Sequence, residues 1–430
     1  MKKQTTRPSH SRGSQPRGWD ILSQSVAGTS CPRIIPTIIL TALALPTTAS
    51  AESILDTPFT QLNESVPGTF NFNIRTRFEH FRTPAEERNG FSQRLRYGYT
   101  TPTFSGFSAM VEGETLYALN GSDEIHPLDQ AGRGTELNQL WLQYQEDGLG
   151  QLRLGRQTYT LDDHRFIGHV GWRQNIQTFD SATLKLQITD EFTANAFYLD
   201  RVNRVNAIDE PLDGFGLNLN YALAPWLNAT AFYYSLQFDN QPGWSNETAG
   251  VRLTGSQEFA PATLAYAFSY AHQRDNSANA PGADFSLDYL AGDVSLKAHG
   301  ITLGTGFEHL EGDGANGFRT PLATVHAFNG HADKFLPIGG FPQGLKDHFV
   351  YLGYTIPVGS GIPIRAAYHW FSPETGSGSY GEEFDLMASY NINKSLGLIA
   401  KYGRYRPDSN AVGPGIGKKD MFTLELNYNF

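Results

Sequence analysis

The side chains with the clearest chemistry in this sequence are arginines placed at alternate positions. Arg75 and Arg77 are separated by a single residue, and so are Arg94 and Arg96. In an extended strand, residues two apart point to the same side. Each pair would therefore present two guanidinium groups on one face. Because a guanidinium can bind a carboxylate through two parallel hydrogen bonds, this spacing indicates a surface suited to anionic groups.

Other charged residues follow the same polar phase or stand beside the ends of strands. The basic ones are Arg153, Arg156, Arg252, Arg365 and Lys401, and the acidic ones are Glu79, Glu112, Glu114, Glu308, Glu383 and Asp385. So many charges cannot face a dry core, because an unpaired buried charge is strongly destabilising. Two interpretations remain open. The charges face a water-filled space, or they pair into ladders across neighbouring strands and stiffen the wall.

Two clusters suggest an enzyme as an alternative. Asp162-Asp163-His164 resembles a catalytic acid cluster, and His326, His331 and Asp333 could be metal ligands. Neither cluster has the spacing of a known site, and no nucleophile motif accompanies them. Asp162 is better interpreted as the partner of a nearby arginine. We therefore expect no catalytic residues, no metal and no cofactor.

Strands are the elements that must position these side chains. In residues 70–78, Phe70, Phe72, Ile74 and Phe78 alternate with polar residues, and the same period of two recurs at 91–99, 215–221 and 264–270. Such alternation places one set of side chains on each face of a sheet. Alternation alone does not distinguish a soluble sheet from a membrane one.

The connections between the strands narrow the choice, because short and long ones take turns. The short ones fall near 102–106, 147–150, 189–191, 224–226, 259–261, 298–300, 357–361 and 391–394. The long ones fall near 83–90, 119–135, 158–176, 203–213, 238–246, 272–284, 310–346, 372–381 and 406–418. Tight periplasmic turns and long external loops are the pattern of an outer-membrane barrel. We predict an all-β fold, a transmembrane antiparallel up-and-down β-barrel of about 18 strands.

The last strand supports a closed barrel. Phe422, Leu424, Leu426, Tyr428 and Phe430 form an apolar row with a polar residue after each of the first four. An unpaired edge this apolar would aggregate, so we expect it to pair with the first strand, at 69–82. The terminal phenylalanine resembles the signal that the barrel-assembly machinery recognises in outer-membrane proteins.

The beginning of the sequence is typical of a secretory signal. Basic residues precede an apolar stretch at 34–45 and the small residues at 49–51, which predicts a signal peptide over residues 1–51. The single cysteine, Cys31, falls within it, so thiol chemistry is not expected in the mature protein. We expect a short periplasmic segment at 52–67 and the barrel at 68–430. The net charge of −10 argues against nucleic acid as a partner.

Two segments resemble the alginate-export family of outer-membrane channels. The first contains GRQ at 155–157, LDDHRFIG at 161–168, WRQN at 172–175 and TFD at 178–180. The second is FRTPLATVHAFNG at 318–330, followed by DKFL at 333–336. The resemblance implies an 18-stranded barrel with a positive constriction that passes an anionic polyuronate. The residues it implies are Arg75, Arg77, Arg94, Arg96, Arg156, Arg165 and Arg173, with Asp162, Asp163 and Asp180 as pairing partners.

The expected function is thus an outer-membrane porin that passes hydrophilic, anionic solutes by diffusion, with alginate-like polyuronates or their oligomers as the solutes. The partners would be outer-membrane lipid, the barrel-assembly machinery and an anionic polysaccharide or oligosaccharide. The alternatives are a non-selective general porin, an outer-membrane enzyme and a purely structural barrel. The long segment 310–346 carries Val325, Phe328 and Phe335, too much apolar surface for a free loop. We expect it to fold partly into the mouth or lumen.

Overall fold

The structure, a computed structural model, describes residues 56–277 and 284–430, so the predicted signal peptide lies outside the described residues. The regular structure of the described part is almost entirely strand. These are β1 (Thr69–Arg82), β2 (Glu87–Thr100), β3 (Phe107–Ala118), β4 (Gly134–Glu146), β5 (Gly150–Gln157), β6 (Thr178–Gln187), β7 (Phe192–Asn203), β8 (Asp209–Ala224), β9 (Leu227–Phe238), β10 (Asn246–Phe259), β11 (Ala262–Asp275), β12 (Ser286–Ala298), β13 (Ile301–Leu310), β14 (Leu345–Ile356), β15 (Ile362–Ser372), β16 (Gly381–Asn391), β17 (Leu396–Pro407) and β18 (Lys419–Asn429).

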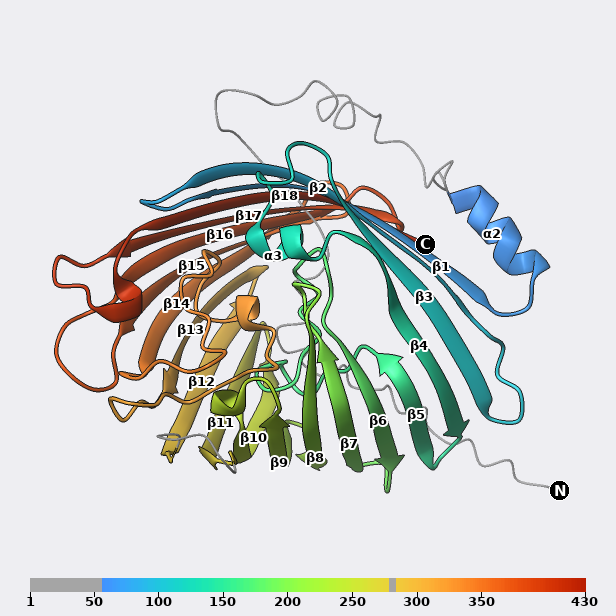
Figure 1. The fold of residues 1–430 in the computed structure, drawn as a ribbon, viewed down its shortest axis with the longest axis horizontal. Coiled ribbons are helices and arrows are strands. Elements are labelled where there is room, and N and C mark those ends of the chain that lie inside the picture. The colour runs from blue at the N-terminus through green and yellow to red at the C-terminus, as the bar shows by residue number, and fades with distance from the viewer. Residues whose placement is uncertain (1–55, 278–283) are drawn as a thin grey trace.

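The helical elements are short. They are α2 (Asp56–Ser65), α3 (Pro127–Ala131) and the 3-10 turns η2 (Pro242–Trp244), η3 (Val325–Ala327) and η4 (Gly413–Gly415). Helix α2 lies outside the barrel (Figure 1), within the segment expected to precede it, and the Asn63 side chain accepts a hydrogen bond from the Phe70 N–H. No helix of the described residues is long and apolar enough to cross a membrane.

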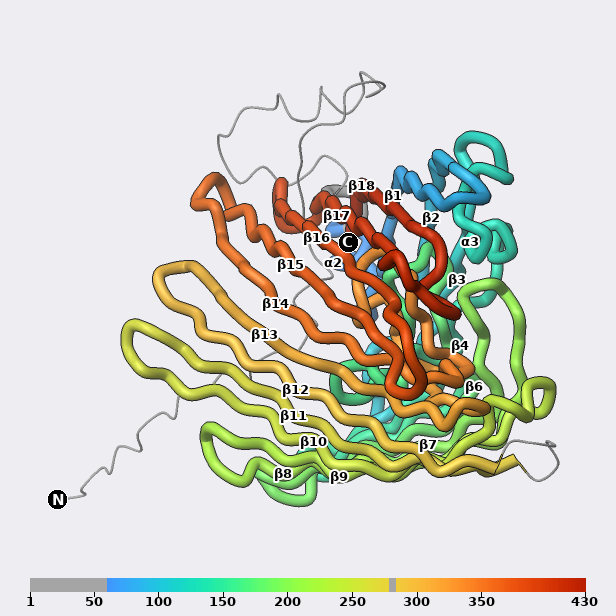
Figure 2. Tube along the Cα trace, turned by 90° about the vertical axis from the view of Figure 1, so that its left-hand side faces the viewer, coloured from blue at the N-terminus to red at the C-terminus, as the bar shows by residue number. Residues whose placement is uncertain are grey.

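The eighteen strands form one closed antiparallel sheet, as predicted. Each strand pairs with the next one in the chain, and β18 pairs with β1. Ile74 lies opposite Tyr428 in this closing pair, and the blue and red strands meet in Figure 1. Figure 2 shows β10 to β15 side by side in chain order. Closure removes the exposed edge that the apolar row of β18 would otherwise present.

The alternation of the sequence divides the wall into two faces. On β4, Leu140 and Leu142 are 51% and 50% exposed, whereas Trp141 and Gln143 between and beside them are buried. Exposed apolar residues around a closed barrel form the face that contacts lipid. The buried side chains of each strand therefore point into the lumen, and most charged residues of the strands are among them.

The connections match the predicted rhythm with two clear exceptions. The region 203–213 was expected to be a long loop, but the β7–β8 connection spans only residues 204–208, because residues 209–213 belong to β8. The region 83–90 was expected to be a long loop, but the turn between β1 and β2 spans only residues 83–86. The prediction failed because Arg88, Asn89 and Gly90 are polar or small yet still pair with β1, opposite Phe81, His80 and Glu79. A polar outer end of a strand is indistinguishable from a loop by composition alone.

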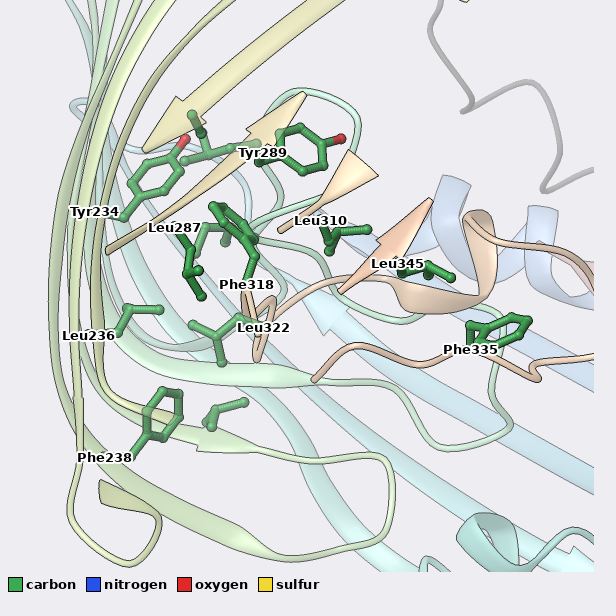
Figure 3. Packing of buried hydrophobic residues seen from close by; sticks show 14 of the residues in the cluster. Tyr234, Leu236, Phe238, Leu287, Tyr289, Leu310, Phe318, Leu322, Phe335 and Leu345 are labelled. Carbon is green, nitrogen blue, oxygen red and sulfur yellow. The ribbon is translucent and has the colours of Figure 1, made fainter. Parts of the chain in front are cut away.

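A large apolar cluster lies inside the barrel, where long connections pack against the wall. Figure 3 shows Phe318, Leu322 and Phe335 of the β13–β14 connection in one cluster with Tyr234 of β9 and Tyr289 of β12. All five side chains are at most 2% exposed. Full burial of one large apolar side chain stabilises a fold by about 1.5–3 kcal/mol. These contacts therefore hold the connection inside the barrel, as the sequence predicted for 310–346.

Candidate functional site

Two loops fill part of the lumen and touch each other there. One is the β5–β6 loop, residues 158–177, and the other is the β13–β14 loop, residues 311–344. Ile167 of the first forms a parallel bridge with Leu322 of the second, and the Gly168 N–H donates to the Leu322 carbonyl at 2.8 Å. Both partners of this bridge are fully buried. The two loops thus form one inward-folded body that narrows the barrel.

Arginines of β1 and β2 hold the backbone of the β5–β6 loop. Arg75 donates through Nη1 to the Gly171 carbonyl at 2.9 Å and to the Arg173 carbonyl at 3.2 Å. Arg94 donates to the Gln174 carbonyl at 3.4 Å, and Arg77 donates to the Trp172 carbonyl. An irregular segment has carbonyl groups that lack partners from regular structure, and buried ones need donors. These three arginines therefore anchor the loop, a role that the sequence did not suggest.

The same arginines share few counter-charges. Glu425 of β18 pairs with Arg77 at 2.7 Å and with Arg75 at 3.1 Å. Glu114 of β3 pairs with Arg96 and lies 3.9 Å from Arg94. Glu79 of β1 lies 3.9 Å from Arg77 and also binds Arg173. Four guanidinium groups of β1 and β2 thus face three carboxylates, so arginines outnumber acids on this part of the wall. The pairing across neighbouring strands is the ladder that the sequence left open as an alternative.

The two predicted loop arginines are buried in ion pairs. Arg165 binds Glu308 of β13 at 2.7 Å, and both side chains are almost fully buried. Arg173 lies 3.3 Å from both Glu79 and Asp333. Burial alone would lower the pKa of Arg173, but the surrounding carboxylates raise it overall. Arg173 therefore remains charged, and the ion pairs of both arginines fix the loops to the wall.

An aromatic cluster joins the two loops at their contact. Trp172 stacks on His326 and also lies under two cations, Arg77 at 4.2 Å and Lys401 at 3.8 Å from the ring centroid. Lys401 Nζ lies 2.9 Å from His326 Nε2. Because the Asp333 carboxylate only accepts hydrogen bonds, His326 Nδ1 carries the imidazole proton and donates it to Asp333 at 2.6 Å. Nε2 then has a free lone pair and accepts the bond from Lys401.

The β13–β14 loop approaches the wall closely beside this cluster. A Cβ atom on Gly403 of β17 would lie only 2.5 Å from the backbone nitrogen of Ala332. Ala332 donates its N–H to Glu383 of β16 at 2.6 Å, and the His331 N–H donates to Asp385 at 3.0 Å. A glycine at 403 therefore allows the loop to hydrogen-bond to the wall at this level.

A cavity of about 310 Å³ remains between the loops and the wall. Of the ten predicted site residues, Arg75, Arg96 and Asp163 line it. Further charged groups around it are Arg252, Asp293, Glu308, Asp347, Arg365, Asp385, Lys401 and Glu425, together with His164, His169, His326, His331 and His369. Most of these lie on strands whose alternating phase already marked them as inward. These residues were absent from the predicted site because that site was taken from the family resemblance and not from strand alternation.

Several acids of this lining contact basic or polar partners among the described residues. Asp163 pairs with Arg252 at 2.5 Å. Asp347 is 2.9 Å from His369, and Asp293 accepts a hydrogen bond from the Tyr351 hydroxyl at 2.9 Å. The lining as a whole carries six carboxylates against five arginines and lysines, so its charge is of mixed sign. The excess of arginine is local to the β1–β2 side, where Arg75 and Arg96 line the cavity.

The remaining predicted residues lie elsewhere. Arg77, Arg94, Arg165 and Arg173 are at most 3% exposed and brace the loops. Arg156 and Asp180 form a two-contact ion pair, at 2.7 and 3.0 Å, outside the lumen. Arg156 lies opposite the lipid-facing Leu140, so the strand phase directs it outward. Asp162 is exposed, and it accepts a hydrogen bond from Asn218 at 2.7 Å.

The metal alternative for His326, His331 and Asp333 finds no geometric support. Within residues 56–277 and 284–430, no group of three or more His, Cys, Asp and Glu side chains is placed to hold a metal ion. His326 and Asp333 bind each other directly instead. Burial of His331 and the nearby Lys401 cation lower its pKa well below the ordinary value.

A closed barrel with a lipid-facing outer wall and a charged, loop-narrowed lumen defines an outer-membrane channel. The chain belongs to the Gram-negative porin family, whose sequence profile matches residues 39–410. It is accordingly an outer-membrane porin and not an enzyme. The match shows the porin family and not alginate export in particular.

Solved structures of other channels share the fold. OpdO of Pseudomonas aeruginosa is 13% identical, with a TM-score of 0.65 over 85% of this chain and 97% of its own. OccK8 (OprE) of the same organism is 15% identical, with a TM-score of 0.65 over 84% and 98%. OccAB2 of Acinetobacter baumannii is 16% identical, with a TM-score of 0.64 over 84% and 98%. No curated protein matches the chain.

Proposed function

We propose that this porin passes small hydrophilic solutes that carry carboxylates, of which short uronate oligomers of the alginate type are one class. The observation that supports this most directly is the charge of the β1–β2 wall. Four arginines there share Glu79, Glu114 and Glu425, and Arg75 and Arg96 of this group line the cavity. A guanidinium excess in a narrow, hydrated passage attracts carboxylates and releases them again.

The size of the cavity favours short solutes over a long polymer. A volume of about 310 Å³ lies at the lower end of the range of small-molecule sites. The two loops that bound it are joined to each other and to the wall by buried ion pairs. A long polyuronate would have to thread past them one sugar at a time. Transport is passive diffusion, so the solute gradient sets its direction.

Reversal potentials in planar bilayers test the proposal, and Arg96→Gln is the informative variant. Among the described residues, the ion partner of Arg96 is Glu114, and Arg96 does not hold the β5–β6 loop. A unit charge about 8 Å from a passing ion changes the ion's energy by about 0.5 kcal/mol in water, or roughly twofold in permeability ratio. We expect the unmodified protein to prefer anions and Arg96→Gln to lose about half of that preference.

Arg156→Gln is the matched control, because it removes an arginine from the outside of the wall. It should leave selectivity unchanged. Block of the current by uronate dimers and trimers should weaken in Arg96→Gln and not in the control. Cation preference in the unmodified protein would reject the carboxylate proposal and leave a general porin, the alternative consistent with a lining of both signs.

A further inference from the structure

Two histidines contact each other on the outer wall of the barrel. His309 is the second-last residue of β13, and His348 is the fourth residue of β14. Their Nε2 atoms are 3.2 Å apart and their ring centroids 4.9 Å apart. Glu308 and Asp347, the residues just before them, are buried in the lumen. Strand alternation therefore directs both imidazoles outward, near the ends of the strands that carry the long loops.

The distance between the two nitrogens suits a shared metal ion. Two imidazole nitrogens, each about 2.0–2.1 Å from a tetrahedral Zn²⁺, lie about 3.3–3.4 Å from each other. The observed 3.2 Å is within a few tenths of an ångström of this value. Without a metal, one ring donates its Nε2 proton to the other. Metal binding requires only that this proton move to Nδ1, so that both rings remain neutral and both Nε2 lone pairs become available.

The surroundings hold the rings in place and leave them accessible. Phe307 packs against both imidazoles, with centroids 5.2 Å from His309 and 6.5 Å from His348. Lys346 lies directly opposite His309, but Glu374 pairs with it at 3.0 Å and compensates its charge. His348 is exposed and His309 is partly exposed. An ion can therefore reach the pair from outside, without entering the lumen.

We propose that His309 and His348 form a two-ligand site for a divalent transition-metal ion, with water at the remaining positions. Imidazole ligands favour Cu²⁺, Ni²⁺ and Zn²⁺ over Mg²⁺ and Ca²⁺, and Cu²⁺ should bind most tightly. Since the described residues supply only these two ligands at the site, the ion exchanges with the medium and is not a structural metal. The site is independent of the solute passage and of the function proposed above.

The test is Cu²⁺ and Zn²⁺ titration of the purified, untagged protein in detergent, with calorimetry and Cu²⁺ electron paramagnetic resonance. We expect one equivalent of Cu²⁺ coordinated by two imidazole nitrogens. His309→Gln and His348→Gln should each lose the two-nitrogen signature and weaken binding by roughly tenfold or more. Heat-modifiable electrophoretic mobility shows whether each variant retains a folded barrel.

His80→Gln is the control, because His80 lies on the outer phase of β1 and its side chain contacts Asn89 rather than a second imidazole. It should leave both the affinity and the spectrum unchanged. Two-nitrogen coordination that persists in the His309→Gln, His348→Gln double variant would place the metal among the lumenal histidines and overturn the proposal. Absence of Cu²⁺ binding in the unmodified protein would overturn it as well.

Discussion

Trp172 and His326 stack face to face, with ring centroids 4.1 Å apart and ring planes 3° from parallel. Trp172 belongs to the β5–β6 loop and His326 to the β13–β14 loop, so the stack joins the two segments that narrow the lumen. Arg77 and Lys401 reach the indole from the wall. The pair therefore connects both loops to β1 and β17.

Trp172→Ala should widen the passage. The substitution removes the stack and two cation–π contacts, each worth about 1–2 kcal/mol when desolvated, while the barrel hydrogen bonds remain. We expect higher and noisier single-channel conductance with little change in the melting temperature of the barrel. Trp226→Ala at the exposed β8–β9 turn should leave the conductance unchanged. Equal conductance in the two variants would show that the stack does not set the passage.

Acidification should loosen the same contact through His326. Burial lowers the pKa of His326 to about 3, against an ordinary value of 6.5. Asp333 opposes this shift, whereas Lys401 and Arg173 add to it. Between pH 6.5 and 3 the folded state therefore binds fewer protons than the unfolded chain. The stability that neutral His326 contributes to the folded state is complete above pH 6.5 and is lost as the pH falls from 6.5 toward 3. We expect conductance to rise between pH 7 and pH 5.

The variant His326→Gln separates this titration from others in the lumen. Burial also lowers the pKa of His169 to about 3, so some pH dependence should persist in His326→Gln. The slope of conductance against pH should nevertheless be smaller than in the unmodified protein. A variant that responds to pH with the full slope would assign the effect to His169 or to the other lumenal histidines.

Glu308→Gln should destabilise the inner loops more than the barrel. The change leaves the buried Arg165 guanidinium without its carboxylate, which costs about 3–5 kcal/mol for a buried pair. Limited proteolysis should then cut within 311–344 much faster than in the unmodified protein. Glu87→Gln breaks the exposed pair with Arg82 and should change the cutting rate little, because exposed pairs contribute about 0–1 kcal/mol.

Deletion of Phe430 should impair membrane insertion more than synthesis. Phe430 and Phe72 exchange two backbone hydrogen bonds, at 2.8 and 3.2 Å, at the seam between β18 and β1. The deletion removes these bonds and the last aromatic side chain of the apolar row. We expect less heat-modifiable protein in the outer membrane at an unchanged total amount. Deleting Lys418, in the long connection before β18, should be tolerated. Similar losses from both deletions would show that Phe430 has no special role in insertion.

Alternation and connection length were sufficient to predict the barrel. They located β1 at 69–82, counted the strands and placed the inward charges of β10, β15 and β17 correctly. These signals are local, because side chains two apart share a face in any strand. The same phase groups Arg156 with the lipid-facing Leu152 and Leu154. Arg156 had nevertheless been grouped with the inward charges, and that prediction was wrong.

The contacts of the inner loops could not be predicted in the same way. Arg94 was expected to line the passage, but its guanidinium binds the carbonyl of Gln174, eighty residues along the chain. Nothing in the period of a strand specifies which distant carbonyl an inward arginine meets. The Trp172 cluster was missed for the same reason, because its members come from two loops and two strands. Only the apolar content of 310–346 indicated that something folds inward there.

The β5–β6 loop is held by strands that are not its neighbours in the sheet. Arg75 and Arg77 of β1 bind its backbone, and both are braced by Glu425 of β18. These anchors therefore depend on the closing pair of strands, because Arg75 and Arg77 come from β1 and the carboxylate that both contact comes from β18. A substitution at this seam would consequently be felt by a loop inside the lumen, whereas the packing of Phe318 against Tyr289 of β12 does not involve the seam.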